Sequence, residues 1–143
     1  MIQRIQSVWF LLAALFGFLI TQIPLFVVRF NNNVERRILA TESLLLFSVG
    51  VGLACLAAAC IFLYKNRSLQ FRLAVIGVII SIALISLEVW KTGTYRTQYA
   101  SNMLSSSYYW GGLLPVAMTI CFILAARGVY KDNKLIKSQD RLR

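Results

Sequence analysis

Four long apolar stretches fill most of this 143-residue chain, and they constrain its fold more than any other feature. They cover about residues 7–28, 41–64, 69–90 and 109–129, and each is about as long as a helix that crosses the hydrocarbon core of a bilayer. Backbone amides find no water there, so a spanning segment must satisfy them internally, as a helix does. The sequence therefore predicts an all-α, antiparallel four-helix bundle in a membrane, as a single domain 1–143 with a short basic tail at 130–143.

The first apolar stretch could instead be the core of a cleaved signal peptide, because Arg4 precedes it. However, the stretch continues through Ile20 to Val28, which is longer than a typical signal core. No small-x-small cleavage pattern precedes the polar segment that follows. We therefore expect this stretch to be retained as the first span.

The net charge of +10 would suggest nucleic-acid binding in a soluble protein, but the positions of the basic residues indicate membrane topology instead. Ten of the fifteen fall on the side of the two termini in a four-span arrangement: Arg4, Lys65, Arg67, Arg72, Arg127, Lys131, Lys134, Lys137, Arg141 and Arg143. The other side holds Arg29, Arg36, Arg37, Lys91 and Arg96. Because basic residues in short loops stay in the cytoplasm, we predict that both termini are cytoplasmic and that no nucleic acid is bound.

The segments between the stretches are polar. Residues 29–40 are typical of a short outer loop, and residues 91–108 could form a short hairpin or lie irregularly on the bundle. We expect Thr41 to cap the second helix and Ser68 to cap the third. Small residues recur on the second helix, including Ala54 and Ala58, and such stripes let helices approach closely in lipid.

No catalytic motif and no set of cofactor or metal ligands is present in the sequence. The chain has no histidine, the commonest metal ligand and general base. Its three cysteines lie in predicted spans, where the default interpretation is a small buried apolar side chain. We therefore expect a protein that is not an enzyme and binds no cofactor.

Apart from Glu42 at the very start of the second stretch, Glu88 is the only acidic residue within a predicted span, and an intramembrane carboxylate is a candidate functional site. It could bind a proton or a cation, with Gln22 as a polar residue at similar depth. Its nearness to Trp90 and Lys91 favours the alternative, in which it meets water or pairs with Lys91 at the outer interface.

Three segments on the side of the termini carry a resemblance to a known family. They are the opening MIQRIQS (1–7), the turn YKNRSLQFRL (64–73) and the ending KDNKLIKSQDRLR (131–143). Together they resemble the family called domain of unknown function 4293, small four-span membrane proteins of Bacteroidota, and the likeness covers the whole chain. The resemblance implies the inner membrane of a Gram-negative cell, and it implies no catalytic residues.

The distinctive residues of these segments would share the cytoplasmic face. Topology alone requires positive charge there, but it requires neither particular amides nor an Asp-Arg pair. We therefore predict an interaction face made of Gln3, Arg4, Gln6, Asn66, Arg67, Asp140, Arg141 and Arg143. The function we predict is an accessory or scaffold subunit, and the alternative is a small transporter or channel that uses Glu88.

The basic tail 130–143 places lysines at 131, 134 and 137, spaced for one side of a helix. Such a helix could lie on anionic lipid, anchor the topology or bind a cytoplasmic partner. The partners we expect are anionic lipids at the cytoplasmic face and either another membrane protein or a second copy of the chain.

Overall fold

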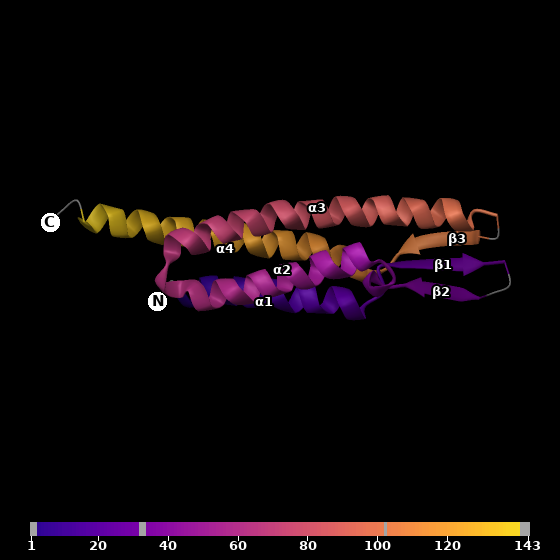
Figure 1. Cartoon of the computed structure of the whole chain (residues 1–143), viewed down its shortest axis with the longest axis horizontal. Coiled ribbons are helices and arrows are strands. Elements are labelled where there is room, and N and C mark those ends of the chain that lie inside the picture. The colour runs from indigo at the N-terminus through magenta and orange to yellow at the C-terminus, as the bar shows by residue number, and fades with distance from the viewer. Residues whose placement is uncertain (1–2, 32–33, 102, 141–143) are drawn as a thin grey trace.

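The structure is a computed structural model that describes residues 3–31, 34–101 and 103–140, and Figure 1 shows a bundle of long helices joined to a small sheet. The helices are α1 (Gln3–Gln22), α2 (Leu44–Phe62), α3 (Arg67–Tyr99) and α4 (Leu114–Asp140). The strands are β1 (Phe26–Phe30), β2 (Glu35–Ile38) and β3 (Met103–Tyr108). Short 3-10 turns lie at Ala40–Glu42, Leu63–Lys65 and Trp110–Leu113. Both chain ends lie at the end of the bundle opposite the sheet (Figure 1).

All four helices contain a segment long and apolar enough to cross a membrane, as the sequence predicts. Their shared core holds large apolar side chains such as Phe10, Leu53, Met118 and Phe122, all almost fully buried. The outward sides of the helices expose isoleucine, valine and phenylalanine, as expected of surfaces that face lipid. The chain is therefore a multi-pass membrane protein with a helical bundle.

Small residues let the helices pack closely. A Cβ atom added to Gly17 of α1 would lie 2.8 Å from the Cβ of Ala54, so α1 and α2 touch through these two residues. A Cβ added to Gly77 of α3 would lie 2.5 Å from the ring of Phe122 on α4. Such contacts supply the dispersion packing that holds helices together in lipid, and the one at Ala54 confirms part of the predicted small-residue stripe.

Helix α3 is the longest element, with 33 residues and a length of about 50 Å. Its buried residues recur every three or four positions, which keeps them on one side: Gln70, Ala74, Gly77, Ser81, Leu84, Glu88 and Thr92. The same side continues beyond the bundle with Tyr95 and Tyr99, which pack against the sheet. One helix thus belongs to both halves of the molecule (Figure 1).

The sheet has strand order β2-β1-β3, with antiparallel pairing on both sides of β1. Phe26 pairs with Ile38 on one side and with Tyr108 on the other. Phe26, Val28 and Ile38 are buried in a second small core, which Tyr95 and Tyr99 of α3 cover. The prediction of an all-α chain is therefore wrong for the outer segments.

Three helices end at other residues than the predicted spans. The first helix ends at Gln22 rather than near residue 28, because Pro24 disfavours helical backbone at Ile23 and the apolar run Phe26–Phe30 becomes β1. The third helix continues to Tyr99 instead of ending at 90, and the fourth runs to Asp140 through the predicted tail. The thickness of the bilayer sets the length of the apolar segment, but a helix can continue beyond the bilayer, where protein or water surrounds it.

The predicted loops and caps also need correction. Residues 29–40 contain the turn and second strand of a hairpin, and residues 91–108 contain the end of α3 and β3, which pairs with the distant strand β1. Thr41 lies in a 3-10 turn, and α2 is preceded by Ser43. Ser68 lies inside α3, which is preceded by Asn66, and neither helix has a side-chain hydrogen bond at its cap.

Candidate functional site

Glu88 lies where the bundle meets the sheet, and its side chain is almost completely enclosed. The residue is 3% exposed, and its Oε1 atom has no hydrogen-bond partner among the described residues. Gly112 packs against it, since a Cβ atom added there would lie 2.9 Å from Glu88 Oε1. The prediction that Glu88 meets water or pairs with Lys91 is therefore wrong. Lys91 instead lies over the Trp90 ring, 5.3 Å from its centre.

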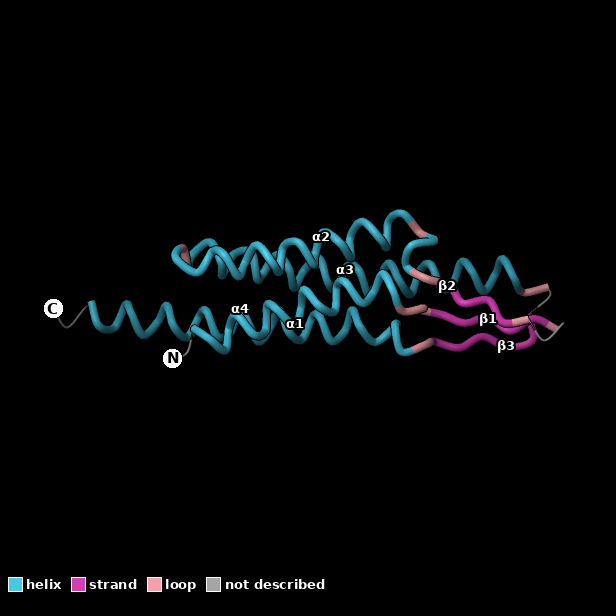
Figure 2. Tube along the Cα trace, turned by 90° about the horizontal axis from the view of Figure 1, so that it is seen from below, coloured by secondary structure: helices cyan, strands magenta, loops and turns pink. Residues whose placement is uncertain are grey.

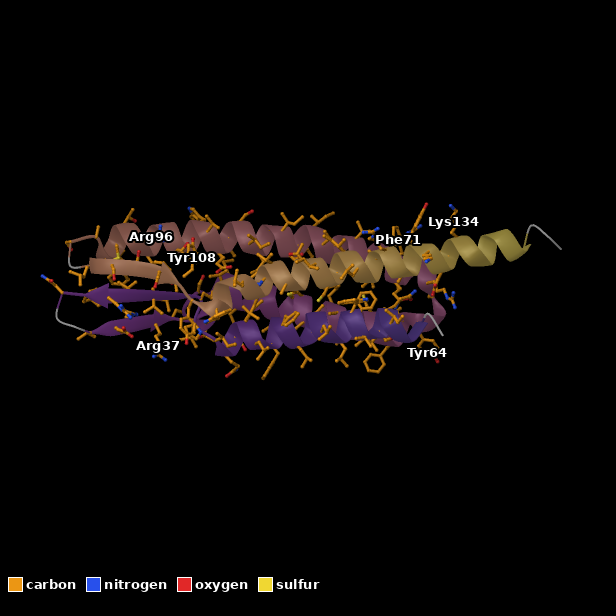
Figure 3. The ribbon with its side chains drawn as sticks, turned by 180° about the vertical axis from the view of Figure 1, so that it is seen from behind. Arg37, Tyr64, Phe71, Arg96, Tyr108 and Lys134 are labelled. Atoms are coloured by element: carbon orange, nitrogen blue, oxygen red, sulfur yellow. The ribbon has the colours of Figure 1, made fainter. Side chains whose placement is uncertain are left out.

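Beyond Glu88, the next turns of α3 contact the strands β1 and β3. Thr92 donates a hydrogen bond to the carbonyl of Val89, and its hydroxyl lies 3.0 Å from that of Tyr108. Arg96 lies over the Phe26 and Tyr108 rings, 5.4 Å and 5.6 Å from their centres (Figure 3). These contacts join the end of α3 to the sheet, next to the turn of α3 on which Glu88 is buried.

Gln22 does not join Glu88 in a polar site. It is exposed at the end of α1, and its Nε2 atom donates to the neighbouring Thr21 hydroxyl at 3.2 Å. On the other side of Glu88, α3 contributes Leu84 to the apolar core, and the hydroxyl of Ser81 donates to the carbonyl of Val78. Within the described residues, the rest of the bundle core is largely apolar, and its other buried polar side chains include Gln70 and Thr119, which donate hydrogen bonds to backbone carbonyls.

At the opposite end, a buried polar contact joins α1 to α4. Gln6 Nε2 donates to Asp132 Oδ2 at 2.7 Å, and the two residues are 6% and 5% exposed. Gly128 makes room for this pair, because a Cβ added there would lie 2.9 Å from Gln6 Cγ. Gln6 therefore belongs to the interior and not to the predicted interaction face.

The rest of the predicted face is only partly described. Asn66 is exposed and Arg67 is half-buried, both at the turn between α2 and α3. The side chains of Gln3, Arg4 and Asp140, and the residues Arg141 and Arg143, lie outside the described part. Of the described candidates, then, two remain at the surface of the end that carries the termini.

The buried role of Asp132 was not predicted from the sequence, because Asp132 lies in a segment rich in lysine that we interpreted as a basic tail. Its helical spacing could have indicated that it is buried. Asp132 continues the buried positions Phe122, Ala125 and Val129 of α4 at intervals of three or four residues. A carboxylate on that side must be enclosed, and it requires a partner such as Gln6.

No three histidine, cysteine, aspartate or glutamate residues gather into a metal site within residues 3–31, 34–101 and 103–140. The three cysteines are unpaired, with Cys60 and Cys121 buried and Cys55 exposed. The buried polar groups at the two ends therefore offer hydrogen bonding and charge, rather than a ligand set.

Comparison with known families agrees with the resemblance in the sequence. The model of the family described as domain of unknown function (DUF4293) matches residues 2–142. The chain belongs to the DUF4293 family. The match extends over the bundle, the sheet segments and almost all of the tail, so both halves of the molecule are part of the DUF4293 unit. No curated protein and no solved structure shows significant similarity to the chain.

Proposed function

We propose that this DUF4293 protein is an accessory or scaffold subunit, without enzymatic activity, in the inner membrane of a Gram-negative bacterium. Its two termini lie in the cytoplasm, where it binds a partner protein. The observation that carries the proposal is the length of α4, which continues past the rest of the bundle (Figure 2). The family membership fits a membrane protein and assigns no activity.

The free end of α4 is a feature that a simple membrane anchor does not need. The contact between Gln6 and Asp132 is near the start of α1, yet α4 runs on to Asp140. Lys134 is exposed on this extension, and Lys131, just before Asp132, is exposed too. A helix that continues past its neighbours is only marginally stable in water by itself, so a partner that packs on it would stabilise it.

The direction of α4 favours a protein partner over the membrane surface. In Figures 1 and 2 the helix continues along the bundle without a bend that would lay it flat. A basic amphipathic helix that binds lipid headgroups lies in the plane of the interface. The excess of basic residues at this end, ten of fifteen, favours the cytoplasm as its compartment.

A second candidate function is transport of a proton or cation through Glu88, which its burial and unpartnered Oε1 atom favour. The apolar layer beside it weighs against this function, because a transport path requires polar groups or water across the bilayer. The accessory role requires no such path. We therefore place transport second.

Truncation after Lys134 tests the accessory role. It removes the end of α4 but keeps the Gln6 to Asp132 contact, so we expect normal abundance and thermal stability in detergent. On native gels of membranes solubilised in mild detergent, the full-length chain should migrate as a complex with a stoichiometric partner, and the truncated chain should migrate alone. An unchanged complex would contradict the role given to α4.

A cysteine-labelling experiment tests the orientation separately. Single cysteines replace Ser68 at the turn between α2 and α3 and Ser107 on β3, both exposed positions. In intact spheroplasts, an impermeant thiol reagent should label Ser107→Cys and leave Ser68→Cys unlabelled. The opposite pattern would reverse the orientation and contradict the cytoplasmic location of the partner.

A further inference from the structure

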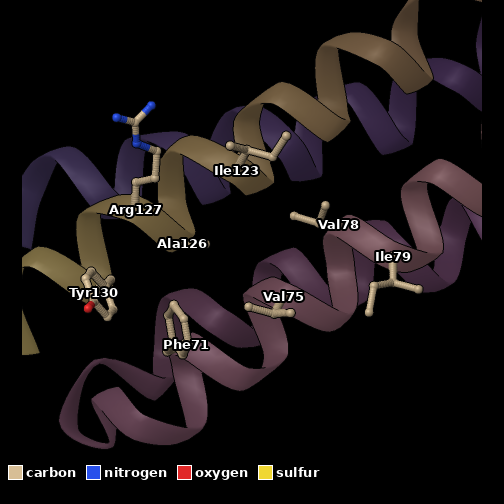
Figure 4. Close-up of a pocket in the computed structure, with 8 residues that line it drawn as sticks. All are labelled: Phe71, Val75, Val78, Ile79, Ile123, Ala126, Arg127 and Tyr130. Carbon is tan, nitrogen blue, oxygen red and sulfur yellow. The ribbon is translucent and has the colours of Figure 1, made fainter.

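A groove lies between α3 and α4 on the outside of the bundle, in the half nearer the chain termini (Figure 4). Its volume is about 310 Å³, within the range of small-molecule pockets. Its walls are apolar and include Phe71, Val75 and Ile79 from α3 and Ile123 and Ala126 from α4. Both helices are membrane-spanning segments, so the groove opens toward hydrocarbon.

Two aromatic rings lie at the end of the groove nearer the termini. Phe71 and Tyr130 lie with their ring centres 5.9 Å apart and their planes inclined at 41°. Arg127 lies one turn before Tyr130 on α4 and contributes its side-chain stem to the lining. Its guanidinium projects away from α3 and out of the groove (Figure 4). The groove therefore combines an apolar floor with a positive charge at its rim.

Arg127 lies near the end of the apolar part of α4, on the side of the chain termini. It is two residues before the end of the apolar stretch 109–129 and within the membrane-crossing helix Trp110–Lys134. It is exposed, and neither of the two ion pairs among the described residues involves it. An arginine at the end of a span extends toward the headgroups, where it can pair with an anion.

The carboxylates of the described side chains cannot supply that partner, even from a second copy of the chain. Glu35 and Glu42 are exposed, but both lie at the sheet end and both already pair with arginine. Glu88 and Asp132 are buried inside the bundle. In a membrane, the abundant anion at the end of a span is the phosphate of a lipid, which an arginine can bind through two parallel hydrogen bonds.

We propose that this groove binds one anionic phospholipid from the leaflet on the side of the chain termini. One acyl chain lies between α3 and α4 against Val75, Ile79 and Ile123, and the lipid phosphate pairs with Arg127. Lys131 and Lys134 follow Arg127 at helical spacings of four and seven residues, and both are exposed. They add positive charge beside the headgroup, which favours a lipid with a net negative charge over a zwitterionic one.

Native mass spectrometry of the purified full-length protein tests the site. The protein is equilibrated in detergent with equal amounts of phosphatidylglycerol and phosphatidylcholine of identical acyl chains. We expect one retained lipid, with phosphatidylglycerol preferred about fivefold through Arg127. Arg127→Gln should abolish the preference, and Arg127→Lys should keep part of it. Ala126→Phe should fill the groove and lower retention of both lipids.

The control is Arg72→Gln, which removes an exposed arginine of α3 that does not line the groove. It should leave the preference unchanged. Thermal unfolding in lipid-free detergent checks that each variant is folded. The proposal is overturned if the wild type retains no lipid, or if folded Arg127→Gln keeps the full preference. It is also overturned if Val75→Cys forms disulfide-linked dimers in membranes, since the groove would then be an interface between copies.

Discussion

At the end of the molecule that carries the chain termini, the buried carboxylate of Asp132 accepts a hydrogen bond from Gln6, whereas at the sheet end Oε1 of the buried Glu88 has no partner among the described residues. The end with the termini is part of a helical bundle in which small residues let the helices pack closely. The sheet end joins three strands to one long helix, α3. The two carboxylates are therefore buried in different ways. Asp132 is hydrogen-bonded to a neighbouring helix, whereas Glu88 is covered by Gly112, from another part of the chain, without a hydrogen bond to its Oε1 atom.

The two ends also differ in their surfaces. The sheet end carries the two ion pairs of the described residues, Arg29 with Glu35 and Arg36 with Glu42, and so its charges are partly balanced. At the other end, Arg127, Lys131 and Lys134 are exposed without such partners. Unbalanced positive charge is what a surface offers to an acidic partner or to anionic lipid. The proposed partner surface is therefore the end of the molecule that has the unbalanced positive charge.

The largest effect is expected where the two halves meet. A Cβ added to Gly111 would overlap the carbonyl oxygen of Pro24, and backbone on both sides leaves little room to move. Gly111→Ala should therefore destabilise the protein by about 3 kcal/mol, measured by thermal unfolding in detergent. Gly93→Ala is the matched control, because a Cβ there meets open space. Equal stability of both variants would show that the junction is not tightly packed.

A smaller loss is expected within the bundle. Ala54→Leu places a larger side chain against Gly17, and it should cost about 2 kcal/mol of unfolding free energy by separating α1 from α2. Ala58→Leu, at a half-buried position on the same helix, should cost less. Ala59→Leu is the control, since Ala59 is exposed on the outward side of α2. If all three variants unfold at the same temperature, the small residues of α2 do not hold α1 and α2 together.

Glu88→Gln separates the charge of the sheet-end carboxylate from its shape. Removing a buried, unpaired charge should raise the unfolding free energy by about 1 kcal/mol, with abundance and partner binding unchanged. The measurements are thermal unfolding and the native-gel complex. A complete loss of cellular function at normal abundance would defeat the accessory role and promote transport to first place.

The smallest effect belongs to the surface of the sheet. Glu35→Gln breaks the ion pair with Arg29, whose atoms are 2.7 Å apart but whose side chains are largely exposed. Exposed pairs are typically worth about 0 to 1 kcal/mol, so thermal unfolding should change little. A loss as large as that of Ala54→Leu would mean that the sheet end depends on its surface charges, contrary to the comparison above.

The sequence predicts the helical half well because the length and composition of a spanning segment are local properties. It fails at the sheet, where the largely apolar run Phe26–Phe30 continues the apolar pattern of the helix before it, and where one strand partner, β3, lies far away in the sequence, with Phe26 paired to Tyr108. The environment of Glu88 could not be predicted either, since β3 and Gly112 close over it from another part of the chain. Asp132 could have been predicted from the helical spacing of its buried neighbours.

Photo-crosslinking in native membranes tests directly whether the partner binds at the end with the termini, because it compares the two ends of the molecule under the same conditions. A photoreactive phenylalanine analogue replaces Lys134 on α4 or Leu104 on β3, both of which are exposed. If the partner binds the end of α4, we expect a discrete protein adduct at position 134 that is absent at position 104, with equal abundance of the two variants. A protein adduct at position 104 alone would contradict the account and assign the partner to the sheet end.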